Sequence, residues 1–74
     1  MDRHSVDSSM AITIGYDPAT STLEIEFKSG EVWQYHQVPK NVYYEMISDS
    51  IGKYFQAHIK GQYAESQVRK KRKR

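Results

Sequence analysis

Apolar and polar residues alternate along three segments in the first half of the chain, and this alternation constrains the fold more than any other feature of the sequence. The segments span residues 10–16, 23–28 and 31–36. A period of two with β-branched residues is typical of strands that bury one face. In the first segment, the face expected to be buried carries Met10, Ile12, Ile14 and Tyr16. An Asp-Pro pair and a Ser-Gly pair separate the segments and favour tight turns, so we expect a three-stranded antiparallel meander.

The length of the second turn decides where two aromatic residues point. A two-residue loop places Trp33 and Tyr35 on the charged face of the sheet, as an exposed platform on which RNA bases could stack. A three-residue loop that ends at Gly30 places Trp33 opposite Ile25, and both aromatic residues then join the core. We expect the three-residue loop, because it collects the apolar residues on one face and gives the left-handed position to glycine.

The second half of the chain has the spacing of amphipathic helices. A first helix is expected to begin at Val38-Pro39, and its apolar residues recur at i, i+1, i+4 and i+5. Polar residues 48–50 end this pattern and can cap a second helix, which Gly61 is expected to end. The predicted fold is α+β: three antiparallel strands followed by two helices packed on one face of the sheet, in the order βββαα.

The two ends of the chain lack these patterns. Residues 1–9 have no apolar periodicity, and residues 66–74 are polar and then basic. We therefore expect a disordered N-terminus (residues 1–9), a folded domain (10–65) and a disordered basic tail (66–74).

The charge of the chain is divided unevenly between the body and the tail. Residues 1–68 carry five Lys or Arg and nine Asp or Glu, a net charge of −4, whereas the last six residues are all basic and bring the chain to +2. A folded body that binds phosphate backbones is expected to be basic itself. The basic run can bind nucleic acid or an acidic protein surface, and it consists of Arg69, Lys70, Lys71, Arg72, Lys73 and Arg74.

Two further charged features are candidates for partner binding. Glu24, Glu26 and Glu31 form an acidic strand face that can meet a basic segment of a partner protein. Lys53 stands at the start of the second helix, where backbone N–H groups can hold an anion.

The sequence gives little support for catalysis or metal binding. Cysteine is absent, and His4, His36 and His58 have no ligand spacing. We expect a non-enzymatic binding protein with no cofactor and no metal. Since no apolar run approaches the length of a signal-peptide core or a membrane helix, we expect a cytoplasmic monomer without a membrane partner.

From Ser8 to Glu65 the chain resembles the KTSC domain family, named for the C-terminus of some lysyl-tRNA synthetases. The matching motifs are Ile14-Gly15-Tyr16-Asp17, Leu23-Glu24-Ile25-Glu26-Phe27 with Gly30, Trp33-Gln34-Tyr35, Val38-Pro39 with Val42-Tyr43, Ser50-x-Gly52-x-Tyr54-Phe55, Ile59 and Tyr63.

This resemblance implies two alternative functions. Among stand-alone members, the chain is similar to a phage-encoded regulator of host RNA polymerase. That likeness implies a transcription regulator that binds bacterial RNA polymerase, inhibits initiation and promotes antitermination, which is our leading hypothesis. The alternative is an RNA- or tRNA-binding accessory module, because RNA binding has been supposed for the family.

Overall fold

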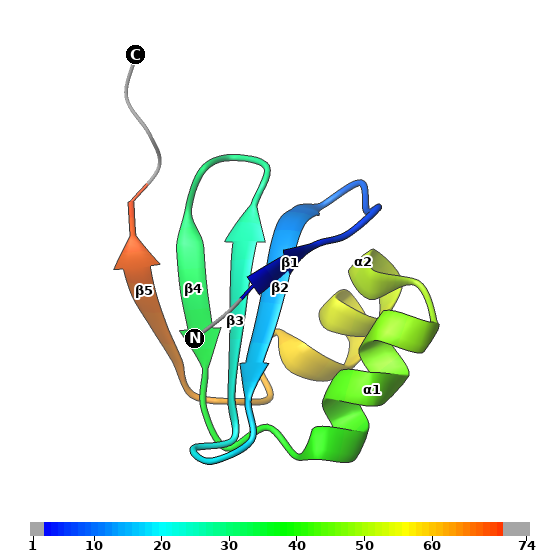
Figure 1. Ribbon diagram of the computed structural model, residues 1–74, viewed down its shortest axis with the longest axis vertical. Helices are drawn as coiled ribbons and strands as arrows, with labels where there is room; N and C mark the ends of the chain where they lie inside the picture. Colours follow the sequence, from blue (N-terminus) through cyan, green and yellow to red (C-terminus); the bar gives the residue numbers. More distant parts are fainter. Residues whose placement is uncertain (1–2, 71–74) are drawn as a thin grey trace.

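The computed structural model describes residues 3–70 of the 74-residue chain. One antiparallel sheet contains all the strands of this described part, in the same order as in the sequence: β1 (Arg3–Ser5), β2 (Ala11–Asp17), β3 (Thr22–Phe27), β4 (Val32–Tyr35) and β5 (Glu65–Arg69). Between β4 and β5 the chain forms α1 (Lys40–Ser48), α2 (Ile51–Tyr54) and the π-helical turn η1 (Phe55–Ile59). The helices lie together on one side of the sheet (Figure 1).

The α+β class is confirmed, but the three-stranded βββαα arrangement is wrong because the sheet contains five strands within residues 3–70. The additional strands β1 and β5 lie at the two edges, within residues 1–9 and at the start of the basic tail. Neither has the apolar alternation of a half-buried strand, since pairing with one neighbour requires backbone groups rather than apolar side chains. The domain boundaries at residues 9 and 65 stay a prediction.

The predicted register of the β3–β4 hairpin is confirmed. Trp33 pairs with Ile25 in the ladder, and the backbone N–H of Phe27 donates to the carbonyl oxygen of Glu31 at 2.8 Å. Gly30 has a φ of +98°, a conformation that glycine adopts without steric cost. Tyr35 is buried in the core, whereas Trp33 is half-buried and packs against the core with part of its surface.

A β-bulge in β2 changes one part of the predicted core. The register shifts between Ala11 and Thr13, so Ile12 is the extra residue on this strand. Ala11 is consequently buried on the helix side, and Ile12, which we expected in the core, is 41% exposed. The prediction holds for Ile14, which is fully buried opposite Ile25.

The helices supply the other half of the core. Met46 of α1 is fully buried, as are Phe55 and Ile59 of η1 to within a few per cent. Ser50 caps α2 as expected, because its hydroxyl accepts the backbone N–H of Lys53 at 3.4 Å. Within residues 3–70, no helix has the length and the apolar character that crossing a membrane requires. The cytoplasmic location stays a prediction.

Candidate functional site

The carboxylate of Glu24 lies on the sheet face opposite the helices and has two partners in its own chain. It forms an ion pair with the guanidinium of Arg3 at 3.2 Å and accepts a hydrogen bond from the side-chain amide of Gln34 at 2.8 Å. In the register, Gly15 of β2 stands between Arg3 and Glu24. Because Gly15 has no side chain, the long arginine side chain can cross β2 to reach β3.

Glu26 has a corresponding arrangement on the other side of β3. Its carboxylate pairs with the guanidinium of Arg69 at 2.8 Å and accepts the hydroxyl of Thr13 at 3.0 Å. The hydrogen bond from Arg69 is the main reason that the pKa of Glu26 lies below its ordinary value, and the bond from Thr13 adds to it. Val32 stands between Arg69 and Glu26 in the register and is 97% buried, since only 3% of it is exposed.

Glu31, the third predicted acidic residue, is also engaged within the chain. Its Oε1 accepts the indole Nε1–H of Trp33 and the side-chain amide of Gln67, both at 3.0 Å. The Oε2 atom has a longer contact, 3.4 Å, with the hydroxyl of Ser29. A role of these three carboxylates in binding a basic partner stays a prediction, although each already has a donor in its own chain.

A cleft lies on the helix side of the sheet, between the β3–β4 hairpin and η1. Its volume is about 430 Å³, and its aromatic walls come from Phe27, Trp33, Tyr35 and Phe55. Phe55 meets Phe27 and Tyr35 edge to face, with ring centroids 5.6 and 5.4 Å apart. Burial raises the pKa of the Tyr35 phenol well above its ordinary value, and nearby carboxylates add to this effect, so Tyr35 stays a neutral donor.

Lysine side chains gather around this cleft. Lys28 and Lys60 line the cleft itself, together with the carboxylates of Glu31 and Glu65. An open hollow of about 790 Å³ adjoins the cleft, shares Met10 and Gln56 with it, and is lined by Lys53. The predicted residue Lys53 thus lies on an extension of the cleft, although the backbone at the start of α2 is capped by Ser50 rather than left open for an anion.

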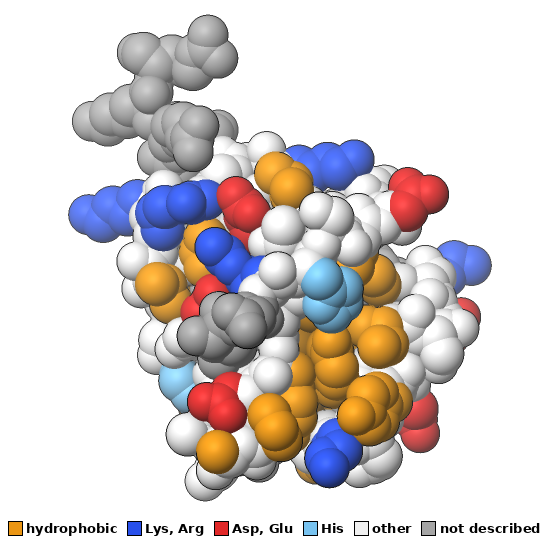
Figure 2. Space-filling model, viewed as in Figure 1, with side chains coloured by type: hydrophobic (Ala, Val, Ile, Leu, Met, Phe, Trp, Pro, Cys, Tyr) orange, Lys and Arg blue, Asp and Glu red, His pale blue; other side chains and the backbone are white. Residues whose placement is uncertain are grey.

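The basic run begins close to the same end of the molecule. Arg69 is the last residue of β5, and its Nε–H donates to the carbonyl oxygen of Gly30 in the β3–β4 loop at 3.0 Å. Lys70 follows and is exposed. Figure 2 shows Lys and Arg side chains gathered at the end of the molecule where β5 ends. The predicted tail residues Lys71, Arg72, Lys73 and Arg74 lie outside the described residues.

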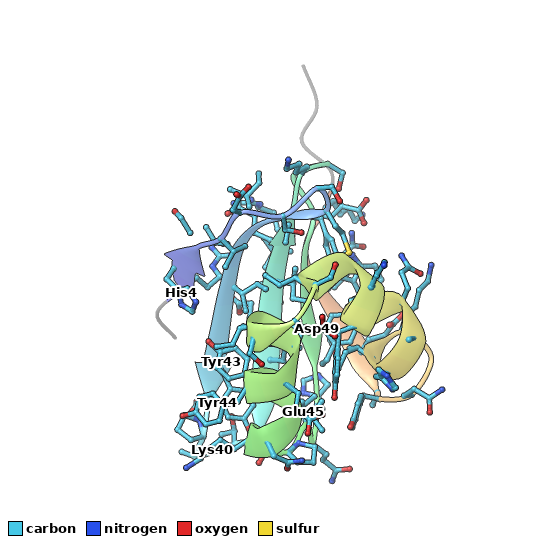
Figure 3. The ribbon with its side chains drawn as sticks, turned by 90° about the vertical axis from the view of Figure 1, so that its right-hand side faces the viewer. His4, Lys40, Tyr43, Tyr44, Glu45 and Asp49 are labelled. Carbon is cyan, nitrogen blue, oxygen red and sulfur yellow. The ribbon has the colours of Figure 1, made fainter. Side chains whose placement is uncertain are left out.

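A second surface, between β2 and α1, is rich in tyrosine. Tyr16 and Tyr43 stack with ring centroids 4.9 Å apart, and the Tyr16 hydroxyl donates to the carbonyl of Val38. Tyr44 is 55% exposed beside them. Lys40 lies at the far end of this surface, away from the β3–β4 loop (Figures 1 and 3). Most of the aromatic surface of this region is therefore used in packing α1 against the sheet.

The histidines are dispersed as the sequence indicated. His36 shares a hydrogen bond of 3.0 Å with the hydroxyl of Ser66, His58 packs on the ring of Tyr54, and His4 lies exposed on β1 (Figure 3). Within residues 3–70, no three His, Asp or Glu side chains are grouped so that they could hold a metal ion.

Sequence reasoning missed the cleft and the two lysines that line it. Lys28 and Lys60 are 32 positions apart in the sequence, and only the packing of η1 on the β3–β4 hairpin brings them to one site. The Trp33-Gln34-Tyr35 motif was the available signal, because one of its aromatic residues remains half-buried at the cleft.

Comparisons with known proteins agree with this fold. The family model of the KTSC domain matches residues 7–63. The crystal structure of a KTSC domain protein from Yersinia pestis is 35% identical and superposes with a TM-score of 0.88, over 90% of this chain and 96% of that chain. An uncharacterized protein of Stutzerimonas stutzeri is 38% identical over 64 residues, which are 85% of this chain and 90% of that protein.

A further relative is a much longer protein. A lysine–tRNA ligase of a Nostoc species is 43% identical over 54 residues, which are 72% of this chain but only 10% of the ligase. None of these matches supports the resemblance to a phage-encoded regulator of RNA polymerase. The extent of the family match and the agreement with the solved structure settle the classification: the chain belongs to the KTSC domain family.

Proposed function

We propose that this chain is a non-catalytic accessory module that binds RNA. One observation carries the proposal: three of the four lysines before Arg69, namely Lys28, Lys53 and Lys60, line the cleft or its adjoining hollow. Lysines along a groove neutralise the phosphates of a nucleic-acid strand, and aromatic walls offer surfaces on which bases stack. This local cluster supports RNA binding even though the body as a whole is acidic.

The position of the basic run adds to this support. The hydrogen bond of Arg69 to Gly30 holds the end of β5 against the loop that carries Lys28. Lys70 therefore continues the basic surface from the loop, and the electrostatic attraction of the run can add to that of the cleft. The homologous segment of a lysine–tRNA ligase belongs to a protein that acts on tRNA, which favours RNA as the nucleic acid.

Binding of labelled single-stranded RNA and tRNA to the full chain, followed by fluorescence anisotropy at increasing salt, tests the proposal. We expect Lys28→Gln with Lys60→Gln to weaken binding and to lower the slope of log Kd against log salt by about 0.7 for each lysine lost. Lys40→Gln is the control, because Lys40 lines neither the cleft nor the adjoining hollow and lies away from the β3–β4 loop (Figures 1 and 3). Absence of binding at low salt would overturn the proposal. The same loss of affinity per lysine removed in the cleft variant and in Lys40→Gln would also overturn it.

RNA polymerase as a partner, our leading hypothesis from the sequence, stays a prediction that the structure favours less. Two of the carboxylates expected to meet a basic segment, those of Glu24 and Glu26, already form ion pairs with Arg3 and Arg69 of the same chain. Capture of polymerase subunits from a bacterial lysate that survives nuclease treatment, combined with no affinity for purified RNA, would favour the polymerase hypothesis over RNA binding.

A further inference from the structure

The cleft has the size of a site for one small planar group. Its volume of about 430 Å³ lies in the range of about 300–1,000 Å³ that small-molecule sites occupy. It is far too small for a helix or for a paired nucleic-acid duplex, whose bases are stacked on one another and inaccessible from the side. An unpaired base that has turned out of the strand is the part of an RNA that matches these dimensions.

Trp33 provides the stacking surface. Its ring takes part in none of the ring-to-ring contacts within residues 3–70, while the rings of Phe27 and Tyr35 each pack against Phe55. The hydrogen bond from its Nε1–H to Glu31 at 3.0 Å fixes the orientation of the indole. A half-buried indole held in this way loses little conformational freedom when a base stacks on it.

The opposite wall contains an unusual helical turn. Residues 55–59 form a π-helix, in which the backbone N–H of Lys60 donates to the carbonyl of Phe55 at 2.9 Å. Single π-helical turns occur frequently at functional sites. Here the wider turn carries Phe55, Gln56 and Lys60 to the cleft.

Glu31 gives the cleft a preference for hydrogen-bond donors. Within residues 3–70, the two stronger donors to Glu31, Trp33 and Gln67, both bond to Oε1, whereas Oε2 has the 3.4 Å contact with Ser29. An ionised carboxylate accepts at about four lone-pair positions and donates none, so acceptor capacity remains on the Oε2 side. A base that fits must therefore present N–H groups at its edge.

Guanine presents the best edge for this carboxylate. Its Watson–Crick edge has two adjacent donors, the ring N1–H and the exocyclic amino group, while adenine and cytosine each offer one amino group and uracil offers one ring N–H. The two lysines of the cleft, Lys28 and Lys60, provide the positive charge that a nucleotide phosphate requires beside the base.

We propose that the cleft binds one unpaired guanine nucleotide, with the base stacked on Trp33, its N–H edge donating to Glu31, and its phosphate held by Lys28 and Lys60. This inference rests on the proposed function, because it names the part of an RNA that the module recognises. With such a site, the module recognises unpaired guanine in RNA and does not bind phosphate backbones generally.

The only tryptophan of the chain is the probe for this proposal, because Trp33 reports base stacking by a loss of fluorescence. The full chain is titrated with guanosine, adenosine, cytidine and uridine monophosphates and with ribose 5-phosphate. We expect quenching by the guanine nucleotide at a concentration lower than for the other bases by on the order of tenfold, which corresponds to about 1.4 kcal/mol. Ribose 5-phosphate is expected to leave the fluorescence unchanged.

Two carboxylate variants test the role of Glu31. Glu31→Gln and Glu65→Gln remove the same charge from the same cleft, but only Glu31 bonds to Trp33. We expect Glu31→Gln to abolish the preference for guanine and Glu65→Gln to retain it. If Glu31→Gln fails to fold, Lys28→Gln with Lys60→Gln replaces it and is expected to weaken binding of all four nucleotides equally while the preference for guanine persists.

The outcomes separate this inference from the proposed function. RNA binding without quenching of Trp33, or with the same preference in both carboxylate variants, overturns the guanine site and leaves RNA binding standing. Quenching by the guanine nucleotide without any affinity for RNA overturns the proposed function and supports the site as one for a free nucleotide. Absence of both overturns both proposals.

Discussion

The central strands β2, β3 and β4 and the edge strands β1 and β5 belong to one sheet, but different interactions hold them in it. The central strands bury Ile14, Leu23 and Ile25 completely against the helices. In β5, by contrast, all five residues are exposed. Apolar alternation in the sequence therefore indicates that one face of a strand is buried. Pairing in a sheet requires only backbone hydrogen bonds, which any residue with a free N–H and C=O can form.

Arginine–carboxylate pairs fasten the two edge strands to the centre. Arg3 of β1 reaches over Gly15 to Glu24, and Arg69 of β5 reaches over Val32 to Glu26. Both carboxylates belong to β3, the middle strand, so each edge is tied across its neighbour to the same strand. The ends of the chain are thereby joined to the centre by charge rather than by apolar burial.

The largest expected effect comes from a change in the central strands. Ile25→Ala removes a fully buried side chain and leaves a cavity, which lowers the free energy of unfolding by about 2–5 kcal/mol. A core of this size supplies only about 3–5 kcal/mol, so the variant is expected to retain little stability and to unfold at a much lower urea concentration. Urea denaturation followed by circular dichroism measures the loss.

Val68→Ala on β5 is the matched edge variant. The register of β4 with β5 shifts between Gln67 and Arg69, so Val68 is an extra residue on β5, and it is 55% exposed. Its truncation is expected to change the free energy of unfolding by less than about 0.5 kcal/mol. Equal losses for the two variants would show that the edge is held by apolar burial as well.

Hydrogen exchange gives the second comparison. Amides of β3 are expected to exchange only through global unfolding, while amides of β5 that bond to β4 exchange through local opening of the edge. We expect exchange in β5 to be faster by on the order of a hundredfold, which corresponds to about 2.7 kcal/mol. Nuclear magnetic resonance of the native protein measures both sets of amides, and equal protection would contradict a separately opening edge.

The contrast between centre and edge also explains how far the sequence predicts this structure. The hairpin of β3 and β4 was predictable to the exact pairing of Ile25 with Trp33, because the apolar pattern and the position of Gly30 favour the same register. The edge strands were not, because Arg3 and Arg69 carry no periodic signal and their partners lie 21 and 43 positions away. A charge in a terminal segment is as compatible with a solvated tail as with an ion pair.

The candidate site was likewise predictable only in part. The sequence indicated the basic run by its charge and Lys53 by its place at the start of a helix, and Lys53 lines the hollow beside the cleft. The cleft itself could not be predicted, since it depends on the π-helical turn that places Phe55 and Lys60 opposite Trp33. The spacing of Ile51, Phe55 and Ile59 at i, i+4 and i+8 is compatible with an ordinary α-helix, so it does not reveal the wider turn.

A third, smaller effect is expected at the turn of the central hairpin. Gly30→Ala places a side chain on a residue with a φ of +98°, a conformation that costs a non-glycine residue about 1–2 kcal/mol. The midpoint of urea denaturation is expected to fall accordingly, with no change in the slope of the transition. Ser29→Ala in the same exposed loop is the control and is expected to have a smaller effect.

The smallest expected effect comes from the ion pair that fastens β5. Arg69→Gln removes the partner of Glu26 and is expected to lower the free energy of unfolding by about 0.2–1 kcal/mol at neutral pH, because the guanidinium is partly exposed and water screens the pair. Arg3→Gln, which removes the corresponding pair at the β1 edge, is expected to have an effect of similar size.

The pH dependence of the stability lost in Arg69→Gln tests whether Glu26 is the source of that loss. The pKa of Glu26 is lowered in the folded state, so its contribution to stability is fully present above its ordinary value of 4.5 and disappears as the pH falls through the folded value. Because Arg69 is the main cause of the lowered pKa, the wild-type protein and Arg69→Gln are expected to differ at pH 7 and to converge as the pH falls below 4.5 through the folded pKa of Glu26. Urea denaturation of both proteins between pH 3 and pH 7 measures this convergence. A difference in the free energy of unfolding that stayed constant over the whole pH range would contradict a role for the charge of Glu26. Arg69 would then hold β5 through its hydrogen bond to the carbonyl of Gly30 and its packing over Val32.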